Sequence, residues 1–176
     1  DCMKHALLLP LVQAAQRKPA GLLLLDTHAG TGRYDLTDGP AALTPAQRTG
    51  EWHAGIARLL DAPPEALAPY VALVQRLGLY PGSPALLHAL LRPQDRLACC
   101  ELHPEDHATL RRAFRHDRQV AIHHRDGWEA LGALLPAPEK RALVLIDPPY
   151  EAEDEFARLA AGLALAQKRQ PNAILA

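Results

Sequence analysis

The sequence predicts an α/β fold in which helices cover both faces of a mostly parallel sheet. Short apolar runs bounded by turn residues recur along the chain, each about as long as a buried strand. Helical patterns lie between most of these runs, and strands that alternate with helices favour a parallel sheet. The chain has 176 residues, of which 48% are hydrophobic and 22% charged, which is enough material for one compact core.

Five segments have the strand pattern and three have the helical pattern that separates strands. The predicted strands are residues 21–26, 96–101, 119–123, 141–147 and 172–176. The predicted helices are residues 105–114, 128–135 and 156–166, where apolar side chains recur three or four positions apart. Because the last apolar run is cut short, we expect the chain to be a fragment whose sheet lacks its C-terminal strands.

The alternation breaks once, because about 70 residues separate the first two predicted strands. Two helical patterns occupy part of this interval, at residues 49–61 and 64–77, and Pro69 is expected to kink or break the second. A disordered loop is the alternative, but it does not need the apolar stripe that begins at Trp52 and Ile56. We therefore expect a discontinuous α/β core at residues 1–37 and 80–176, interrupted by a helical subdomain at residues 38–79.

Composition excludes several classes of protein. Nineteen basic and twenty acidic residues give a net charge of −1, so any nucleic-acid contact must use a local patch. The longest uncharged apolar run, residues 159–166, is too short to cross a bilayer, and the N-terminus lacks a signal-peptide pattern. Cys2, Cys99 and Cys100 match neither a disulfide framework nor a zinc site. We expect a soluble cytoplasmic protein without a metal or a membrane partner.

One segment has the local positive charge that contact with phosphates requires. The candidate residues are Arg111, Arg112, Arg115, His116, Arg118, His123, His124 and Arg125. An ordinary solvated helix face is the competing interpretation, and the inserted subdomain is the competing surface for nucleic acid.

A glycine-containing loop follows the first predicted strand. Gly30 and Gly32, one residue apart, let the backbone approach a ligand at the carboxyl end of the strand. A pair without a third glycine fits a nucleoside-binding methyltransferase loop better than a dinucleotide fingerprint, with a plain structural turn as the alternative.

Three further segments that begin or end predicted elements carry polar candidates. Ser83 is placed to cap a helix that has Pro84 at its first position, which would create an anion site. Glu101 ends the second strand and is a candidate acceptor for two ribose hydroxyls. Asp126, before Gly127, is a candidate acceptor for the exocyclic amine of adenine. The alternative for Ser83 is an ordinary helix start, and the alternative for Glu101 is a solvated strand end. For Asp126 the alternative is a turn.

The most specific motif is Asp147-Pro148-Pro149-Tyr150, at the end of the fourth predicted strand. The prolines fix the backbone and remove two N–H donors, so the Asp147 carboxylate and the Pro148 carbonyl remain as acceptors. Two acceptors holding an exocyclic amine favour its attack on a methyl group, and Tyr150 would stack on the base.

Taken together, the motifs resemble those of S-adenosylmethionine-dependent amino-methyltransferases with an Asp/Asn/Ser-Pro-Pro-aromatic motif. In particular they resemble the bacterial large-subunit ribosomal RNA adenine-N6-methyltransferase J family, also labelled as involved in catabolism of external DNA. The motifs in order are Lys4-His5, Leu25-Asp26-Thr27-His28-Ala29-Gly30, Arg48-Thr49-Gly50-Glu51, Tyr80-Pro81-Gly82-Ser83-Pro84, Glu101-Leu102-His103-Pro104, Asp126-Gly127 and Asp147-Pro148-Pro149-Tyr150.

This resemblance implies a class I, Rossmann-like methyltransferase fold and S-adenosylmethionine as cofactor. It implies cofactor contacts at His5, His28, Ser83, Glu101, Asp126 and Gly127, to which the glycine loop adds Gly30. It makes Asp147 the catalytic carboxylate, also in reach of the cofactor, with Pro148 and Tyr150 beside it. Family members begin earlier and continue beyond residue 176, which leaves the activity of this chain as an open question.

The expected function is methylation of N6 of a specific adenine in 23S ribosomal RNA by a monomeric enzyme. Two alternatives remain, a DNA adenine-N6 methyltransferase and a DNA-uptake protein without catalysis. The intact Asp147 motif argues against the second, since binding alone does not require two acceptors around an amine.

Overall fold

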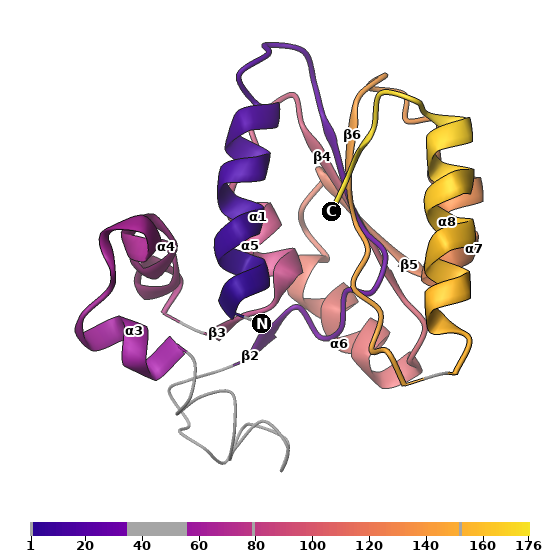
Figure 1. The fold of residues 1–176 in the computed structure, drawn as a ribbon. Helices are drawn as coiled ribbons and strands as arrows, with labels where there is room; N and C mark the ends of the chain where they lie inside the picture. The colour runs from indigo at the N-terminus through magenta and orange to yellow at the C-terminus, as the bar shows by residue number, and fades with distance from the viewer. Residues whose placement is uncertain (1, 35–55, 79, 152) are drawn as a thin grey trace.

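The structure, a computed structural model, describes residues 2–34, 56–78, 80–151 and 153–176. Its centre is a five-stranded parallel sheet in the order β5-β4-β1-β6-β7 (Figure 1). The strands are β1 (Leu23–Asp26), β4 (Arg96–Glu101), β5 (Val120–His124), β6 (Ala142–Leu145) and β7 (Ile174–Leu175). Each lies within or one residue beyond a predicted strand, so the predicted α/β class is confirmed.

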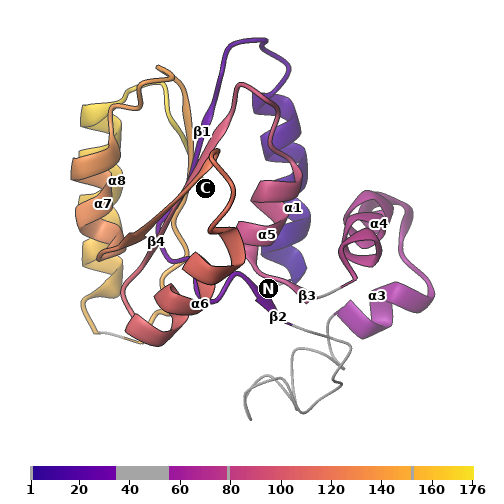
Figure 2. The ribbon, with the colours of Figure 1, turned by 180° about the vertical axis from the view of Figure 1, so that it is seen from behind.

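Helices cover both faces of this sheet (Figures 1 and 2). On one face lie α1 (Cys2–Ala15), α5 (Ser83–Ala89) and α6 (Pro104–Phe114). On the other lie α7 (Gly127–Leu134) and α8 (Glu155–Arg169). Helix α1 was not among the predicted elements, whereas α6, α7 and α8 match the three predicted helices.

Alternate strand residues serve the two halves of the core. Leu24 and Cys99 face the α1 side, whereas Leu25 and Cys100 face the α7 side, and all four are fully buried. Successive side chains of a strand point to opposite faces of the sheet. Because helices cover both faces, apolar side chains are needed on both, and the strands appear in the sequence as continuous apolar runs.

Between β1 and β4 the chain makes a long excursion from the sheet. The two ends of this excursion are joined by a pair of short strands, which we call the stem. Strand β2 (Arg33–Tyr34) pairs antiparallel with β3 (Tyr80–Pro81), with Tyr34 opposite Tyr80. The described part of the excursion is helical and consists of α3 (Ala57–Asp61), a 3-10 helix (Glu65–Leu67) and α4 (Ala68–Leu77). The boundaries 38 and 79 remain predictions, and Trp52 lies outside the described residues.

Pro69 acts as expected within this excursion. It lies in the first turn of α4, directly after the 3-10 helix, so the predicted helix at residues 64–77 is split there. Helix α4 then buries Tyr70 and Val74 against Leu9 of α1 and Leu86 of α5, which joins the excursion to the rest of the core.

At the amino end of the sheet, a buried carboxylate ties several segments together. Asp95 is 1% exposed and accepts hydrogen bonds from the Leu22 backbone N–H at 3.0 Å and from the Gln16 side chain at 3.0 Å. The Arg92 guanidinium donates to both of its oxygens, at 2.8 and 2.9 Å. Desolvation works to raise the pKa of Asp95, but these bonds outweigh it and hold the pKa below its usual range.

Candidate functional site

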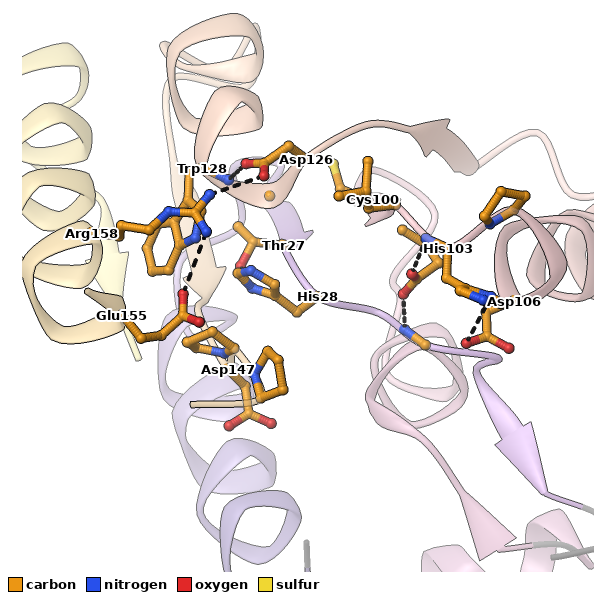
Figure 3. A pocket seen from close by; sticks show the side chains of 17 residues that line it. Thr27, His28, Cys100, His103, Asp106, Asp126, Trp128, Asp147, Glu155 and Arg158 are labelled. Carbon is orange, nitrogen blue, oxygen red and sulfur yellow. Dashed lines mark hydrogen bonds and ion pairs between the residues drawn. The ribbon is translucent and has the colours of Figure 1, made fainter. Parts of the chain in front are cut away.

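A pocket of about 880 Å³ lies at the opposite, carboxyl end of the sheet. The segments that follow β1, β4, β5 and β6 all contribute to its lining, as Figure 3 shows for His28, His103, Asp126 and Asp147. The chain passes from β1 to β4 and β5 on one side and then returns to β6 on the other. Ligands of open α/β sheets bind at such a reversal of strand order.

Strand β1 ends with a buried acid. Asp26 is fully buried, and its Oδ1 accepts a hydrogen bond from the His28 backbone N–H at 3.3 Å. Desolvation raises the pKa of Asp26 to about 6, although Ser83 and the positive charge of Lys4 act in the opposite direction.

His28 and its neighbours build the floor of the pocket. The Thr27 hydroxyl donates to the Leu145 carbonyl at 2.9 Å and lies 2.8 Å from His28 Nδ1. The His28 ring meets Trp128 edge-on, with 5.2 Å between ring centroids. Burial lowers the pKa of His28 against the opposing charges of nearby carboxylates, first among them Asp126.

Glu101 is held in place by two backbone donors. Its Oε2 accepts from the Gly30 N–H and its Oε1 accepts from the His103 N–H, each at 2.7 Å. Gly30 itself has φ of 60°, the left-handed conformation that glycine adopts without strain. Each carboxylate oxygen keeps a second lone pair, so Glu101 is fixed in direction and still able to accept from a diol.

Asp126 caps helix α7. Its Oδ1 accepts from the backbone N–H groups of Trp128 at 2.7 Å and Glu129 at 3.2 Å, and its Oδ2 accepts from Arg158 at 3.1 Å. Asp126-Gly127 is therefore the start of a helix and not the turn that was the alternative interpretation, and the adenine contact remains a prediction. Gly127 permits a close approach, since a Cβ there would lie 2.2 Å from the Thr27 carbonyl oxygen.

Asp147 follows β6 and forms an ion pair with Lys4 of α1. Asp147 and Pro148 line the pocket, but Tyr150 is not among the lining residues. Tyr150 is about half exposed, has φ of 57°, and its ring centroid lies 5.5 Å from that of Phe156.

Two residues implied by the resemblance lie away from the pocket lining. His5 is 1% exposed, and burial, followed by the charge of Lys4, lowers its pKa to about 3. Ser83 is buried beside Asp26, but it is the first residue of α5 and Gly82 is the cap, so the expected capping role of Ser83 is wrong by one position. Gly82 follows β3 with an extended backbone, and the helix begins at the next residue.

The residues of the predicted basic patch lie at the ends of α6 and β5 and directly after them. None of them lines the main pocket. Arg112 donates to Thr109 at 2.9 Å and Arg115 to His116 at 2.8 Å. His124 stacks on His107 with 4.7 Å between centroids. These local contacts leave the role of the patch in nucleic-acid binding as a prediction.

Two ion pairs that the sequence patterns did not single out hold carboxylates of the pocket lining. Lys4 contacts Asp147 across 143 positions of sequence, and Arg158 contacts Asp126 across 32. Trp128 and the buried Glu155 complete this wall. The Lys4-His5 motif is the sequence feature that points to Lys4. No local sequence pattern marks Arg158 as a residue of the site.

A family model described as "Ribosomal RNA large subunit methyltransferase D, RlmJ" matches residues 19–176. The chain belongs to this family. Two RlmJ-family relatives, from Escherichia coli (strain K12) and Haemophilus influenzae, are each named ribosomal RNA large subunit methyltransferase J and are each 39% identical to it. The alignments cover 100% and 89% of this chain, and the chain spans 64% and 57% of the two relatives.

A solved structure has the same fold. The crystal structure of protein LPL1258 from Legionella pneumophila matches with a TM-score of 0.86 and 33% identity, over 99% of this chain and 66% of that one. In the part of this chain that the structure describes, no helix is long and apolar enough to span a membrane.

Proposed function

We propose that this chain carries the cofactor site and the catalytic motif of an S-adenosylmethionine-dependent methyltransferase that modifies N6 of an adenine in 23S ribosomal RNA, in the cytoplasm. The observation that carries the proposal is the meeting of Glu101, Asp126 and Asp147 around one pocket at the reversal of strand order. The RlmJ relatives, by their names, favour ribosomal RNA as the substrate over DNA.

The residues present fit this cofactor. Glu101 offers two oriented oxygens for the ribose hydroxyls, and Asp126 keeps acceptor capacity on Oδ2 for an adenine amine. The pocket volume of about 880 Å³ falls within the range of small-molecule sites. When bound, S-adenosylmethionine supplies a methyl group on a sulfonium, which is an activated leaving group.

Asp147 and Pro148 would act on the substrate amine. The carboxylate of Asp147 accepts one N6 hydrogen and the Pro148 carbonyl accepts the other, so that the nitrogen lone pair turns towards the methyl group. Tyr150 holds the extruded base by stacking. After transfer, the proton leaves N6 to Asp147 or to water.

Lys4 anchors the carboxylate on which this arrangement depends. Its ammonium pairs with Asp147 Oδ2, which leaves Oδ1 outside the pair as the oxygen that accepts from the amine. Positioning of this kind accounts for much of catalysis when the leaving group is already activated.

A methyl-transfer assay tests the proposal. The full-length protein is incubated with labelled S-adenosylmethionine and, separately, a 23S ribosomal RNA transcript or DNA oligonucleotides, and the products are digested to nucleosides. Label in N6-methyladenosine from the transcript is the expected result. Label only in DNA would favour the DNA alternative, and binding without label would favour a non-catalytic role.

A further inference from the structure

Arg158 lies where the two helices on the α7 side meet the pocket. Its Nη2 is 3.1 Å from Asp126 Oδ2 and its Nη1 is 3.9 Å from Glu155 Oε1. The guanidinium carbon lies 5.6 Å from the centre of the Trp128 ring, a cation–π distance. Figure 3 shows the three side chains around Arg158 on one wall of the pocket.

The hydrogen bonds of Asp126 leave little acceptor capacity. A carboxylate has about four lone-pair positions. Two backbone N–H groups, from Trp128 and Glu129, reach Oδ1, and Arg158 occupies one position on Oδ2. The remaining position on Oδ2 has a direction fixed by the helix cap on one side and by the rigid guanidinium on the other.

We infer that Arg158 is a positioning residue that sets the base selectivity of the nucleoside subsite by orienting Asp126. This inference rests on the proposed function, because it takes the purine next to Asp126 to be that of the cofactor. An amino-purine donates its exocyclic N–H to the remaining Oδ2 position. An oxo-purine presents an acceptor to the same oxygen and is rejected.

Charge explains why the guanidinium is needed. Glu155 is 4% exposed and shares this wall with Asp126, and Arg158 is the cation between them. Without Arg158, the two carboxylates lose the cation that lies between them, and their mutual repulsion is no longer offset. The Asp126 side chain is then no longer held with Oδ2 in one direction.

Calorimetric binding to the full-length protein tests this with two ligands that differ only in the base, S-adenosylhomocysteine and S-inosylhomocysteine. The variant is Arg158→Gln, with Arg158→Lys as the conservative change. The matched control is Arg169→Gln on the same helix, whose guanidinium donates to the carbonyls of Leu135 and Gly132 away from the pocket.

The expected change is selective. Arg158→Gln weakens S-adenosylhomocysteine binding by about tenfold, as for one charge-assisted hydrogen bond, and changes S-inosylhomocysteine binding by less than about threefold. Arg158→Lys keeps part of the selectivity, and Arg169→Gln keeps all of it. In an Asp126→Asn background, where the helix cap survives, Arg158→Gln adds little.

Three outcomes overturn the inference while the proposed function stands. They are unchanged selectivity in Arg158→Gln, equal weakening of both ligands, and a full additional loss in the Asp126→Asn background. Equal weakening with a lower melting temperature would make Arg158 a tether between α7 and α8 only. Failure of the unaltered protein to bind S-adenosylhomocysteine would instead count against the proposed function itself.

Discussion

Asp147 is the residue on which methyl transfer is expected to depend most. Asp147→Asn keeps the shape and one acceptor oxygen but loses the charge that pairs with Lys4 and stabilises positive charge on N6. We expect the turnover rate to fall about 10²- to 10³-fold. Single-turnover methylation of the RNA transcript measures the loss, and calorimetry with S-adenosylhomocysteine checks that the cofactor still binds. Turnover within a few-fold of the unaltered protein would remove Asp147 from the mechanism.

Replacing Glu101 with Gln, a side chain of the same shape, is expected to weaken cofactor binding. Both of its oxygens accept backbone N–H groups, from Gly30 and His103, so the amide nitrogen of Glu101→Gln faces a donor whichever way it turns. We expect the affinity for S-adenosylhomocysteine to fall by about 1 to 3 kcal/mol. Calorimetry measures this, and equal affinity for the two proteins would exclude Glu101 from the ribose site.

Asp26 makes stability depend on pH. Its pKa in the folded protein is about 6, above the ordinary 3.8, so its ionisation opposes folding as pH rises through 6. Asp26→Asn keeps the acceptor for the His28 N–H and carries no charge. We expect the variant to gain on the order of 1 to 3 kcal/mol in unfolding free energy relative to the unaltered protein between pH 4 and pH 8. Urea denaturation at the two pH values measures the gain, and a constant difference would contradict it.

At the residue scale, the sequence patterns predicted side chains that follow strands and failed for contacts made across the fold. Glu101 and Asp147 end predicted strands and Asp126 follows one by three positions, so their shared edge follows from parallel strands. The pairing of Lys4 with Asp147 and of Arg158 with Asp126 depends on how helices dock, and no local pattern encodes that.

The packing of α7 against α8 gives a prediction at the scale of elements. A Cβ at Gly162 of α8 would lie 2.8 Å from the Trp128 ring, whereas one at Gly132 of α7 would lie 3.7 Å from Leu165. Gly132→Ala is therefore expected to stabilise the protein by up to about 1 kcal/mol through helix propensity. Gly162→Ala is expected to destabilise it by about 1 to 3 kcal/mol, because the indole must move.

Thermal or urea unfolding of both alanine variants tests this, with each serving as the control for the other. Because Trp128 also lines the pocket, Gly162→Ala should weaken S-adenosylhomocysteine binding, and Gly132→Ala should not. Equal unfolding free energies for the two alanine variants would contradict the prediction, because they would mean that α8 can move away from Trp128 at no cost.

Among the elements, helix α1 and the short strands β2 and β3 were not predicted from the sequence. Helix α1 carries Pro10 and has large apolar side chains on its exposed side as well, such as Met3 and Leu7, so it lacks the polar face that marks a surface helix. Strands β2 and β3 have two residues each, too few to show any period. The parallel strands were clear because burial on both faces makes them continuously apolar.

For the whole molecule, the two ends of the sheet have separate tasks. The amino end is tied by Asp95 and Arg92, whereas the carboxyl end holds the pocket. Arg92→Leu leaves the buried Asp95 carboxylate without its cation, and we expect a loss of about 3 to 5 kcal/mol in unfolding free energy. Because pairing lowers the pKa of Asp95, this loss should be present near neutral pH and shrink as pH falls below about 4, where the carboxyl is protonated.

Urea denaturation from pH 3 to pH 7 measures the loss for Arg92→Leu. The affinity of the folded variant for S-adenosylhomocysteine should equal that of the unaltered protein. A fall in affinity of more than a few-fold would show that the two ends of the sheet are coupled.

The β2–β3 stem bears on how such a fold changes over evolutionary time. Because Tyr34 lies opposite Tyr80, the chain returns from its excursion next to where it left. Segments with adjacent ends can be lengthened, shortened or exchanged without changing the spacing of the strands that they interrupt, and each doubling of such a loop costs only about 0.6 kcal/mol. The stem therefore allows the excursion to change in length outside the packed helix α4, while Gly32 and Gly82, hydrogen-bonded at 3.1 Å beside the stem, hold its two ends together.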